Sequence, residues 1–138
     1  MITCLADQLR RDEGVRLHLY QDTFGKWTIG VGRNLSDVGI SEAEADLLLQ
    51  NDITAASNAL EQAFPWTAAT DDIRRAALVN MVFNMGIATF AEFRGTLALL
   101  QAGDYAGAAQ AMLASKWAEE VGPRAQRLSI QLESGVYQ

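Results

Sequence analysis

Cysteine and histidine are almost missing from this chain of 138 residues, which has one of each, Cys4 and His18. A single cysteine cannot form an internal disulfide, and neither residue has neighbours at metal-ligand spacing. We expect Cys4 to be a small buried residue and His18 to be a surface or half-buried strand residue. A Ser-His-Asp triad or a histidine-rich zinc site would depend on His18, and neither has supporting spacing. No metal site and no cofactor are therefore predicted.

Long apolar runs are also missing. The densest apolar stretch, residues 76–83, is interrupted by Asn80, and a membrane-spanning helix needs about 18 such residues in a row. The first residues lack the basic and then apolar pattern of a secretory signal peptide. Basic residues are the minority, 11 against 17 acidic ones, and the net charge of −6 argues against nucleic acid as a partner. We expect no membrane insertion and no nucleic-acid partner.

Proline is rare and alanine is common, so most of the chain is expected to be helical. Apolar spacing predicts helices over residues 1–13, 41–62 and 73–85, shorter helical pieces near 90–102, 105–113 and 115–119, and a last helix over 123–133. Thr3 is expected to cap the first helix. Ser41 and Glu44 have the spacing of a reciprocal N-terminal cap. Residues 16–32 instead alternate with period two, which predicts a hairpin whose turn is residues 22–26.

This order of elements predicts a mainly α, α+β fold in one domain, and we expect a monomer. A small β lobe would cover about residues 14–40 and a long connecting helix about residues 41–62. The first helix, residues 1–13, is expected to join a helical lobe over about residues 66–138, because its few apolar residues cannot hold it alone. A cleft between two lobes is a usual place for a ligand.

Three polar residues are candidates for chemistry. Glu13 ends the first helix, where the helix dipole disfavours an ionised carboxylate and so favours a proton donor. The alternative is that Glu13 is a solvated residue at a frayed helix end. Several arginines are close to it in sequence, and an arginine that reached it would favour the ionised carboxylate. Asp22 lies in the hairpin turn, where aspartate is common for local reasons. Thr28 shares a strand face with Gly30 and Gly32, which would admit a bound polymer, a bulge or tight packing.

Two carboxyl groups and a hydroxyl around one cleft are the arrangement for hydrolysis of a glycosidic bond. One carboxylic acid protonates the leaving oxygen, and the other carboxylate stabilises the transition state and either attacks the sugar or activates water. Neither role needs a cofactor. Glutamate and aspartate occur near turns in any globular chain, so spacing alone does not establish this function.

The segment DEGVRLHLYQDTFGKWTIGVG, residues 12–32, resembles the catalytic segment of the phage-type lysozymes, glycoside hydrolase family 24. It matches the pattern E-G-x-R-L-x-x-Y-x-D-T-x-G-x-x-T-I-G-x-G throughout. Residues 71–86 and 115–128 resemble the central and closing helices of the same family, so the resemblance covers nearly the whole chain. It implies a lysozyme-like fold with two lobes. It also implies that Glu13 is the proton donor, Asp22 the second catalytic carboxylate and Thr28 a residue on the water side of the sugar.

The Thr28 match implies an inverting reaction, for which the two carboxyl groups lie about 6.5–9.5 Å apart. Arg124 matches an arginine that approaches the proton donor from the last helix. Phe83 matches an aromatic residue of the cleft wall, with core packing as its alternative, and Thr96 a hydroxyl that contacts substrate. The chain has Arg33 where well-known members have histidine, and we expect Arg33 to pair with Asp52 on the connecting helix.

The resemblance further implies a muramidase that cleaves the β-1,4 bond between N-acetylmuramic acid and N-acetylglucosamine in the glycan strand of peptidoglycan. The implied role is host-cell lysis by a phage or prophage endolysin. Such a protein would stay in the host cytoplasm until a holin-type membrane hole lets it reach the periplasm and cell wall. The alternatives are a tail-associated lysozyme, cleavage of chitin, and a relative that binds peptidoglycan without cleaving it. We expect the negative charge to slow the encounter with an anionic wall.

Overall fold

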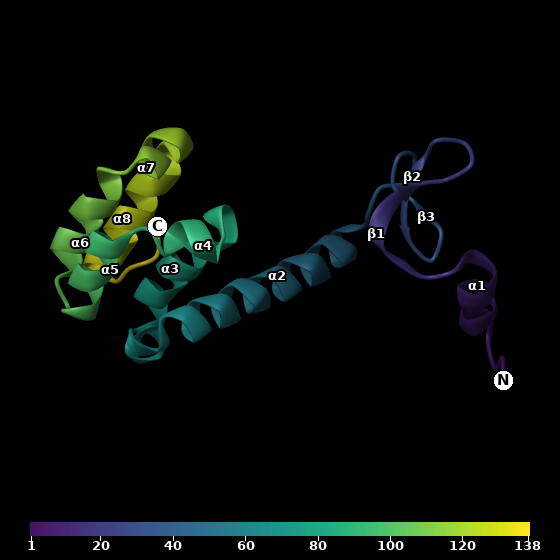
Figure 1. The fold of residues 1–138 in the computed structure, drawn as a ribbon, viewed down its shortest axis with the longest axis horizontal. Helices are drawn as coiled ribbons and strands as arrows, with labels where there is room; N and C mark the ends of the chain where they lie inside the picture. The colour runs from purple at the N-terminus through teal and green to yellow at the C-terminus, as the bar shows by residue number, and fades with distance from the viewer. The chain divides into compact units, whose positions relative to one another are not determined.

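The computed structural model describes residues 1–138 and divides them into two units, Met1–Leu48 and Leu49–Gln138. The chain is mainly helical and has one small antiparallel sheet, so the predicted fold class is confirmed (Figure 1).

The first unit holds the sheet. Its elements are α1 (Leu5–Glu13), β1 (Arg16–Gln21), β2 (Trp27–Gly30), β3 (Arg33–Asn34) and the start of α2 (Glu42–Ala63). The strands run antiparallel in the order β1-β2-β3. The predicted hairpin is confirmed, but its second strand ends at Gly30 rather than at residue 32. Gly30 and Gly32 have φ angles of +69° and +67°, so they turn the chain into a third strand that was not predicted.

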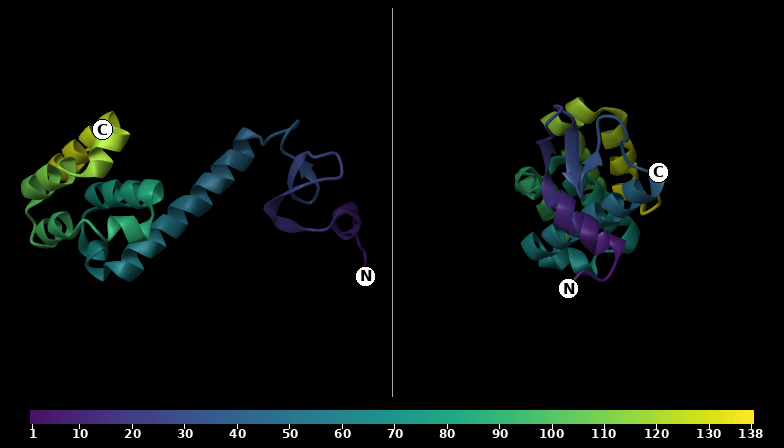
Figure 2. Two further views of the ribbon diagram at one scale, coloured as in Figure 1. Left: turned by 45° about the horizontal axis from the view of Figure 1, so that its top comes forward. Right: turned by 90° about the vertical axis from the view of Figure 1, so that its right-hand side faces the viewer.

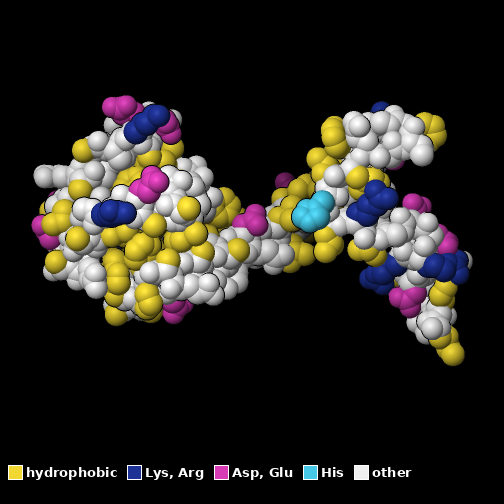
Figure 3. Space-filling model, viewed as in Figure 1, with side chains coloured by type: hydrophobic (Ala, Val, Ile, Leu, Met, Phe, Trp, Pro, Cys, Tyr) yellow, Lys and Arg dark blue, Asp and Glu magenta, His cyan; other side chains and the backbone are white.

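The start of α1 differs from the prediction. The helix begins at Leu5, and its N-cap is Cys4, which makes no side-chain capping bond. The expected cap, Thr3, is one residue too early, and its hydroxyl donates to the Asp7 carboxylate instead (2.9 Å). Cys4 is exposed because α1 has no buried residue, so the expected burial of Cys4 is wrong. His18 lies exposed on β1, as predicted, and is the cyan side chain in Figure 3.

The start of α2 confirms the reciprocal cap. The Glu44 N–H donates to Ser41 Oγ, and the Ser41 N–H donates to Glu44 Oε1, each over 3.2 Å. Arg33 Nη1 donates to Glu44 Oε2 over 2.8 Å. The expected pair between Arg33 and Asp52 is therefore wrong, because Arg33 at the start of β3 binds a carboxylate in the first turn of α2. This ion pair joins the sheet to the helix within the first unit.

The second unit is entirely helical. After the rest of α2 come the short 3-10 helix η1 (Pro65–Ala69), α3 (Asp72–Met85), α4 (Ile87–Phe90), α5 (Arg94–Gln101), α6 (Tyr105–Leu113), α7 (Lys116–Val121) and α8 (Pro123–Ser134). The predicted helices are confirmed to within a few residues. Asp71 caps α3 by accepting from the Arg74 N–H (3.1 Å), and Gly86 ends the helix with a φ of +81°. None of the helices is long and apolar enough to cross a lipid bilayer.

The hydrophobic core lies in the second unit. Its fully buried side chains include Leu60, Leu78, Met81, Phe90, Met112 and Leu132. α6 packs against both α5 and α8, and Figures 1 and 2 show these green-to-yellow helices gathered together. In Met1–Leu48, by contrast, Thr28 is the only buried residue. Apolar side chains such as Leu17 and Phe24 are exposed there, and Figure 3 shows such side chains in yellow on the surface of this unit.

Arg74 ties three helices of the second unit together. Its Nε donates to the Leu132 carbonyl (2.7 Å) and its Nη2 to the Glu133 carbonyl (2.8 Å), so it satisfies free carbonyls at the end of α8. Its guanidinium also lies 3.9 Å from the centre of the Tyr105 ring on α6. These contacts hold α3 against α6 and α8.

Candidate active site

Glu13 is the last residue of α1. Gly14 follows with a φ of +76°, and its N–H donates to the Arg10 carbonyl (2.9 Å), which ends the helix in a fixed way. The exposed Glu13 side chain rests against the turn between β2 and β3. A Cβ placed on Gly32 would lie 3.0 Å from Glu13 Oε2, and Gly32 has a φ of +67°, which residues other than glycine rarely adopt. The Glu13 carboxylate therefore lies close to Gly32, in the turn that joins β2 to β3.

The arginines near Glu13 in sequence are bound elsewhere. Arg10 and Arg11 form ion pairs with aspartates of α1 itself, at 3.2 and 2.7 Å. Arg16 lies 4.3 Å from the centre of a tyrosine ring on β1. None of the three forms an ion pair with Glu13, so none neutralises the proposed acid.

Asp22 is half-buried and is held by its own turn. Its Oδ1 accepts two main-chain hydrogen bonds, from Phe24 N–H (2.8 Å) and Lys26 N–H (2.9 Å), and its Oδ2 accepts none. The Asp22 N–H donates to the Lys26 carbonyl (2.9 Å), which closes the hairpin. One carboxylate oxygen therefore fixes the side chain and the other is free to act on a substrate or a water molecule.

Thr28 sits on the central strand β2, opposite Tyr20 of β1 and Asn34 of β3. Its side chain is buried, with 4% of the residue surface exposed. Its hydroxyl donates to the Lys26 carbonyl (2.9 Å), and the proton is thereby used within the protein. The lone pairs of the oxygen remain, so the hydroxyl can accept a hydrogen bond from a water molecule.

The structure brings these three predicted residues into one unit. Asp22 and Thr28 are both bonded to Lys26, and Glu13 rests on Gly32, four residues after Thr28 in the chain. The predicted separation of the two carboxyl groups stays a prediction.

The three predicted residues of the second unit do not all share one site. Phe83 and Arg124 line the same cavity, of about 610 Å³, whereas Thr96 lines another of about 800 Å³. Phe83 is 44% exposed, so its alternative role in core packing is wrong. Arg124 donates from Nε and Nη2 to Asn80 Oδ1, at 3.0 and 2.8 Å. Its predicted approach to Glu13 stays a prediction.

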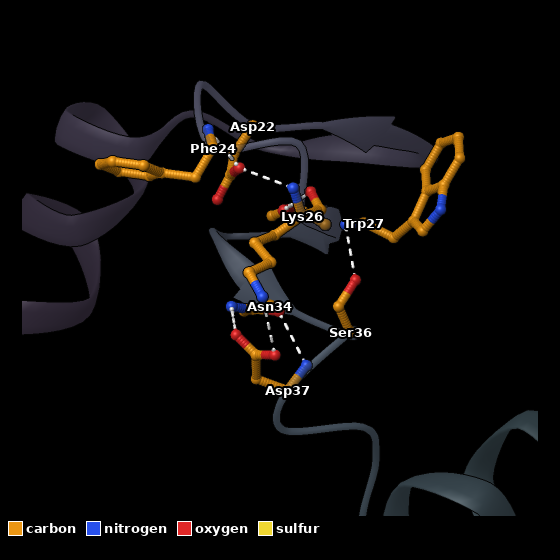
Figure 4. Close-up of polar contacts among 8 residues, drawn as sticks. Asp22, Phe24, Lys26, Trp27, Asn34, Ser36 and Asp37 are labelled. Atoms are coloured by element: carbon orange, nitrogen blue, oxygen red, sulfur yellow. Dashed lines mark hydrogen bonds and ion pairs between the residues drawn. The ribbon is translucent and has the colours of Figure 1, made fainter.

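A set of polar contacts beside Asp22 was not predicted. Lys26 Nζ lies 3.1 Å from Asp37 Oδ1, and Asn34 exchanges two hydrogen bonds with Asp37, each of 3.0 Å (Figure 4). The bonds that the Asp37 carboxylate accepts, from Lys26 first and then from the Asn34 side chain, lower the pKa of Asp37 below its usual value. Lys26 and Asp37 are eleven residues apart in the chain, and no sequence motif relates them. Only the polar turn composition pointed to this region.

Glu13 at the end of α1, Asp22 in the hairpin turn and Thr28 on β2 supply two carboxyl groups and a hydroxyl within one unit, and two carboxyl groups are what most glycoside hydrolases use. The phage lysozyme family model matches residues 10–131. The chain belongs to the phage lysozyme family, and its fold is the lysozyme-like one that the resemblance implied.

The chain is also similar to individual curated proteins. It is 29% identical to "Probable T4-type lysozyme 1" of Dictyostelium discoideum, over 98% of this chain and 96% of that protein. It is 33% identical to an endolysin of Acyrthosiphon pisum secondary endosymbiont phage 1, over 80% of this chain and 75% of that protein. It is 30% identical to the pre-baseplate central spike protein Gp5 of Enterobacteria phage T4, where 95% of this chain matches 28% of that longer protein. These relatives support a lysozyme-like function.

Proposed function

We propose that this chain is a muramidase. It hydrolyses the β-1,4 bond between N-acetylmuramic acid and N-acetylglucosamine in peptidoglycan, with inversion at the anomeric carbon. The observation that carries the proposal is the grouping of Glu13, Asp22 and Thr28 in one unit, in a chain whose family match spans residues 10–131.

Glu13 is the general acid of this reaction. Its carboxyl proton passes to the glycosidic oxygen while the bond from that oxygen to the anomeric carbon breaks. A water molecule attacks the opposite face of the sugar and gives its proton to Asp22 Oδ2, the oxygen left free by the turn. Thr28 accepts a hydrogen bond from the same water, because its own proton is held by the Lys26 carbonyl. The two N–H bonds to Asp22 fix its carboxyl group before substrate binds, and the Glu13 carboxyl group lies close to Gly32.

Hydrolysis of purified sacculi by three single variants tests these assignments. Glu13→Gln cannot donate a carboxyl proton and Asp22→Asn cannot accept one, and we expect each to lower kcat by at least about 100-fold. Asp12→Asn is the matched control, since it removes a neighbouring exposed carboxylate whose only ion pair is with Arg11. Wild-type rates in Glu13→Gln would show that the acid is wrongly assigned.

Product analysis tests the bond and the stereochemistry. New reducing ends should belong to N-acetylmuramic acid, and the first product should carry the α anomer, because an inverting enzyme turns over a β linkage. A β anomer would mean that Asp22 acts as a nucleophile. A parallel assay on chitin shows which of the two polymers, peptidoglycan or chitin, the protein hydrolyses. A wild-type protein that binds sacculi without releasing reducing ends would support the non-catalytic alternative.

The biological role we propose is bacterial lysis by a phage or prophage endolysin acting as a monomer on the glycan strand. In this role the protein waits in the host cytoplasm and reaches the periplasm through a holin-type hole. The endolysin relative supports this role. The match to Gp5 supports the alternative of a tail-associated lysozyme. Gene neighbours coding for a membrane hole or for tail parts would separate the two.

A further inference from the structure

Lys26 is the residue through which the sheet holds both Asp22 and Thr28. Its N–H donates to Asp22 Oδ1, and its carbonyl accepts from the Asp22 N–H and from the Thr28 hydroxyl, all over 2.9 Å. Its main chain therefore lies at the centre of the proposed site. Its side chain carries a positive charge on a flexible four-carbon stem, and that charge must be placed somewhere close by.

The structure places this charge on Asp37. The Lys26 side chain points toward Asp37 and away from the Asp22 carboxylate, as Figure 4 shows, and its Nζ lies 3.1 Å from Asp37 Oδ1. Asp37 is itself fixed by Asn34, which donates from Nδ2 to Asp37 Oδ2 and accepts the Asp37 N–H at Oδ1. Asn34 is the cross-strand partner of Thr28. The acceptor of the lysine charge is thus anchored to the same sheet as the site.

The Asp22 carboxylate is the competing acceptor. Its Oδ2 has no hydrogen-bond partner in the protein, and its Oδ1 is bonded to the main chain of Lys26 itself. A lysine released from Asp37 can fold back to this oxygen. Because the ammonium would occupy Oδ2, Asp22 would accept the proton of the attacking water less readily.

We propose that Asp37 is a positioning residue that acts through Lys26. It holds the Lys26 ammonium away from Asp22, so that Asp22 Oδ2 stays free to accept the proton of the attacking water. This inference rests on the proposed function and adds a residue that the catalytic motif of residues 12–32 does not contain.

A double-mutant cycle on sacculi tests the inference. Asp37→Asn should lower kcat about three- to fivefold with little change in KM, the range expected for one exposed ion pair formed at the wrong place. The same substitution in a Lys26→Met background should leave kcat at the level of Lys26→Met alone, since no ammonium remains to be misplaced. Asp37→Glu, which keeps the charge, should retain most of the wild-type kcat.

Ser36→Ala is the control for a merely loosened loop. It removes the hydrogen bond from the Trp27 N–H to Ser36 Oγ (2.9 Å) without changing any charge, and it should leave kcat near the wild-type value. An unchanged kcat in Asp37→Asn would overturn the inference. An equal loss from Asp37→Asn with or without the Lys26 ammonium would also overturn the inference. That result would mean that Asp37 only stabilises the loop and does not act through Lys26.

A spectroscopic readout separates failure of this inference from failure of the proposed function. The NMR signal of the Asp22 carboxyl carbon should shift in Asp37→Asn and return when Lys26→Met is added. If that pattern appears and Glu13→Gln hydrolyses sacculi as well as wild type does, the lysine is placed as inferred and the function is wrong. If hydrolysis depends on Glu13 and the carboxyl signal does not move, the inference alone is wrong.

Discussion

An added methyl group at Gly32 tests the seat of Glu13 most directly. Gly32 and Gly39 have φ angles of +67° and +66°, and alanine in this left-handed region costs about 1–2 kcal/mol at either position. The two glycines differ in their surroundings. A Cβ at Gly39 would meet no atom within 4 Å, whereas a Cβ at Gly32 would lie 3.0 Å from Glu13 Oε2 and 3.2 Å from its carboxyl carbon.

The size of the expected effect follows from that contact. Ordinary contacts begin at 3.4 Å, so the carboxylate in Gly32→Ala must move by about 0.4 Å. A displacement of about 1 Å in a reacting group can cost about 100-fold in rate, which scales to a loss of about fivefold here. Gly39→Ala shares the backbone strain without moving Glu13, and it should keep the wild-type kcat per folded molecule.

The assay compares initial rates on sacculi with the folded fraction of the first unit, taken from NMR peak volumes of its amides. Normalised in this way, Gly32→Ala should be about fivefold slower than Gly39→Ala. Equal normalised rates in the two variants would refute the reasoning, because they would mean that the position of Glu13 against the turn has no catalytic consequence.

Two further predictions concern the ties that hold each unit. Arg74→Met removes two charge-assisted bonds to carbonyls of α8 and the contact with Tyr105, and it should lower the free energy of unfolding in urea by about 3 kcal/mol. A loss under about 1 kcal/mol would contradict this account. The hydrogen bond from Arg33, and then those from the start of α2, lower the pKa of Glu44 from its usual 4.5. Ionised Glu44 therefore contributes stability above pH 4.5 that is lost as the pH falls through the lowered value. Amide exchange at the start of α2 should accelerate in that acid range in wild type and much less in Glu44→Gln, and identical pH dependence in both would refute it.

The local parts of the fold could be predicted from sequence because the residues that determine them are neighbours. The cap of α2 needs only Ser41 and Glu44, three residues apart, and the cap of α3 needs only Asp71 and the main chain that follows. Apolar spacing placed the helices for the same reason. The third strand was missed because it is two residues long and depends on the left-handed turn at Gly32, which side-chain periodicity does not encode.

Contacts between distant residues could not be predicted. The partner of Arg33 is Glu44 rather than Asp52, a choice made by how β3 meets α2 in space. Cys4 is exposed because α1 buries none of its residues, although cysteine is usually buried.

The candidate site also has local features that sequence could predict and spatial features that it could not. Glu13, Asp22 and Thr28 lie in a short, nearly continuous segment whose local hairpin brings the last two together. Their connection through Lys26 runs over main-chain groups, which no side-chain pattern reveals. Phe83 and Thr96 line different cavities, a result of helix packing that the family motif alone does not contain.

The uneven distribution of buried side chains has a practical consequence for protein engineering. The denaturant slope and the heat-capacity change of unfolding both scale with the apolar surface that unfolding exposes. Every residue of the hydrophobic core belongs to Leu49–Gln138, whereas Glu13 and Asp22 lie in a unit whose one buried residue is Thr28. A calorimetric scan would therefore follow the helices and miss damage to the sheet. Variants selected only for a high melting temperature could therefore lose the hairpin that carries Asp22, and the calorimetric scan would not show the loss.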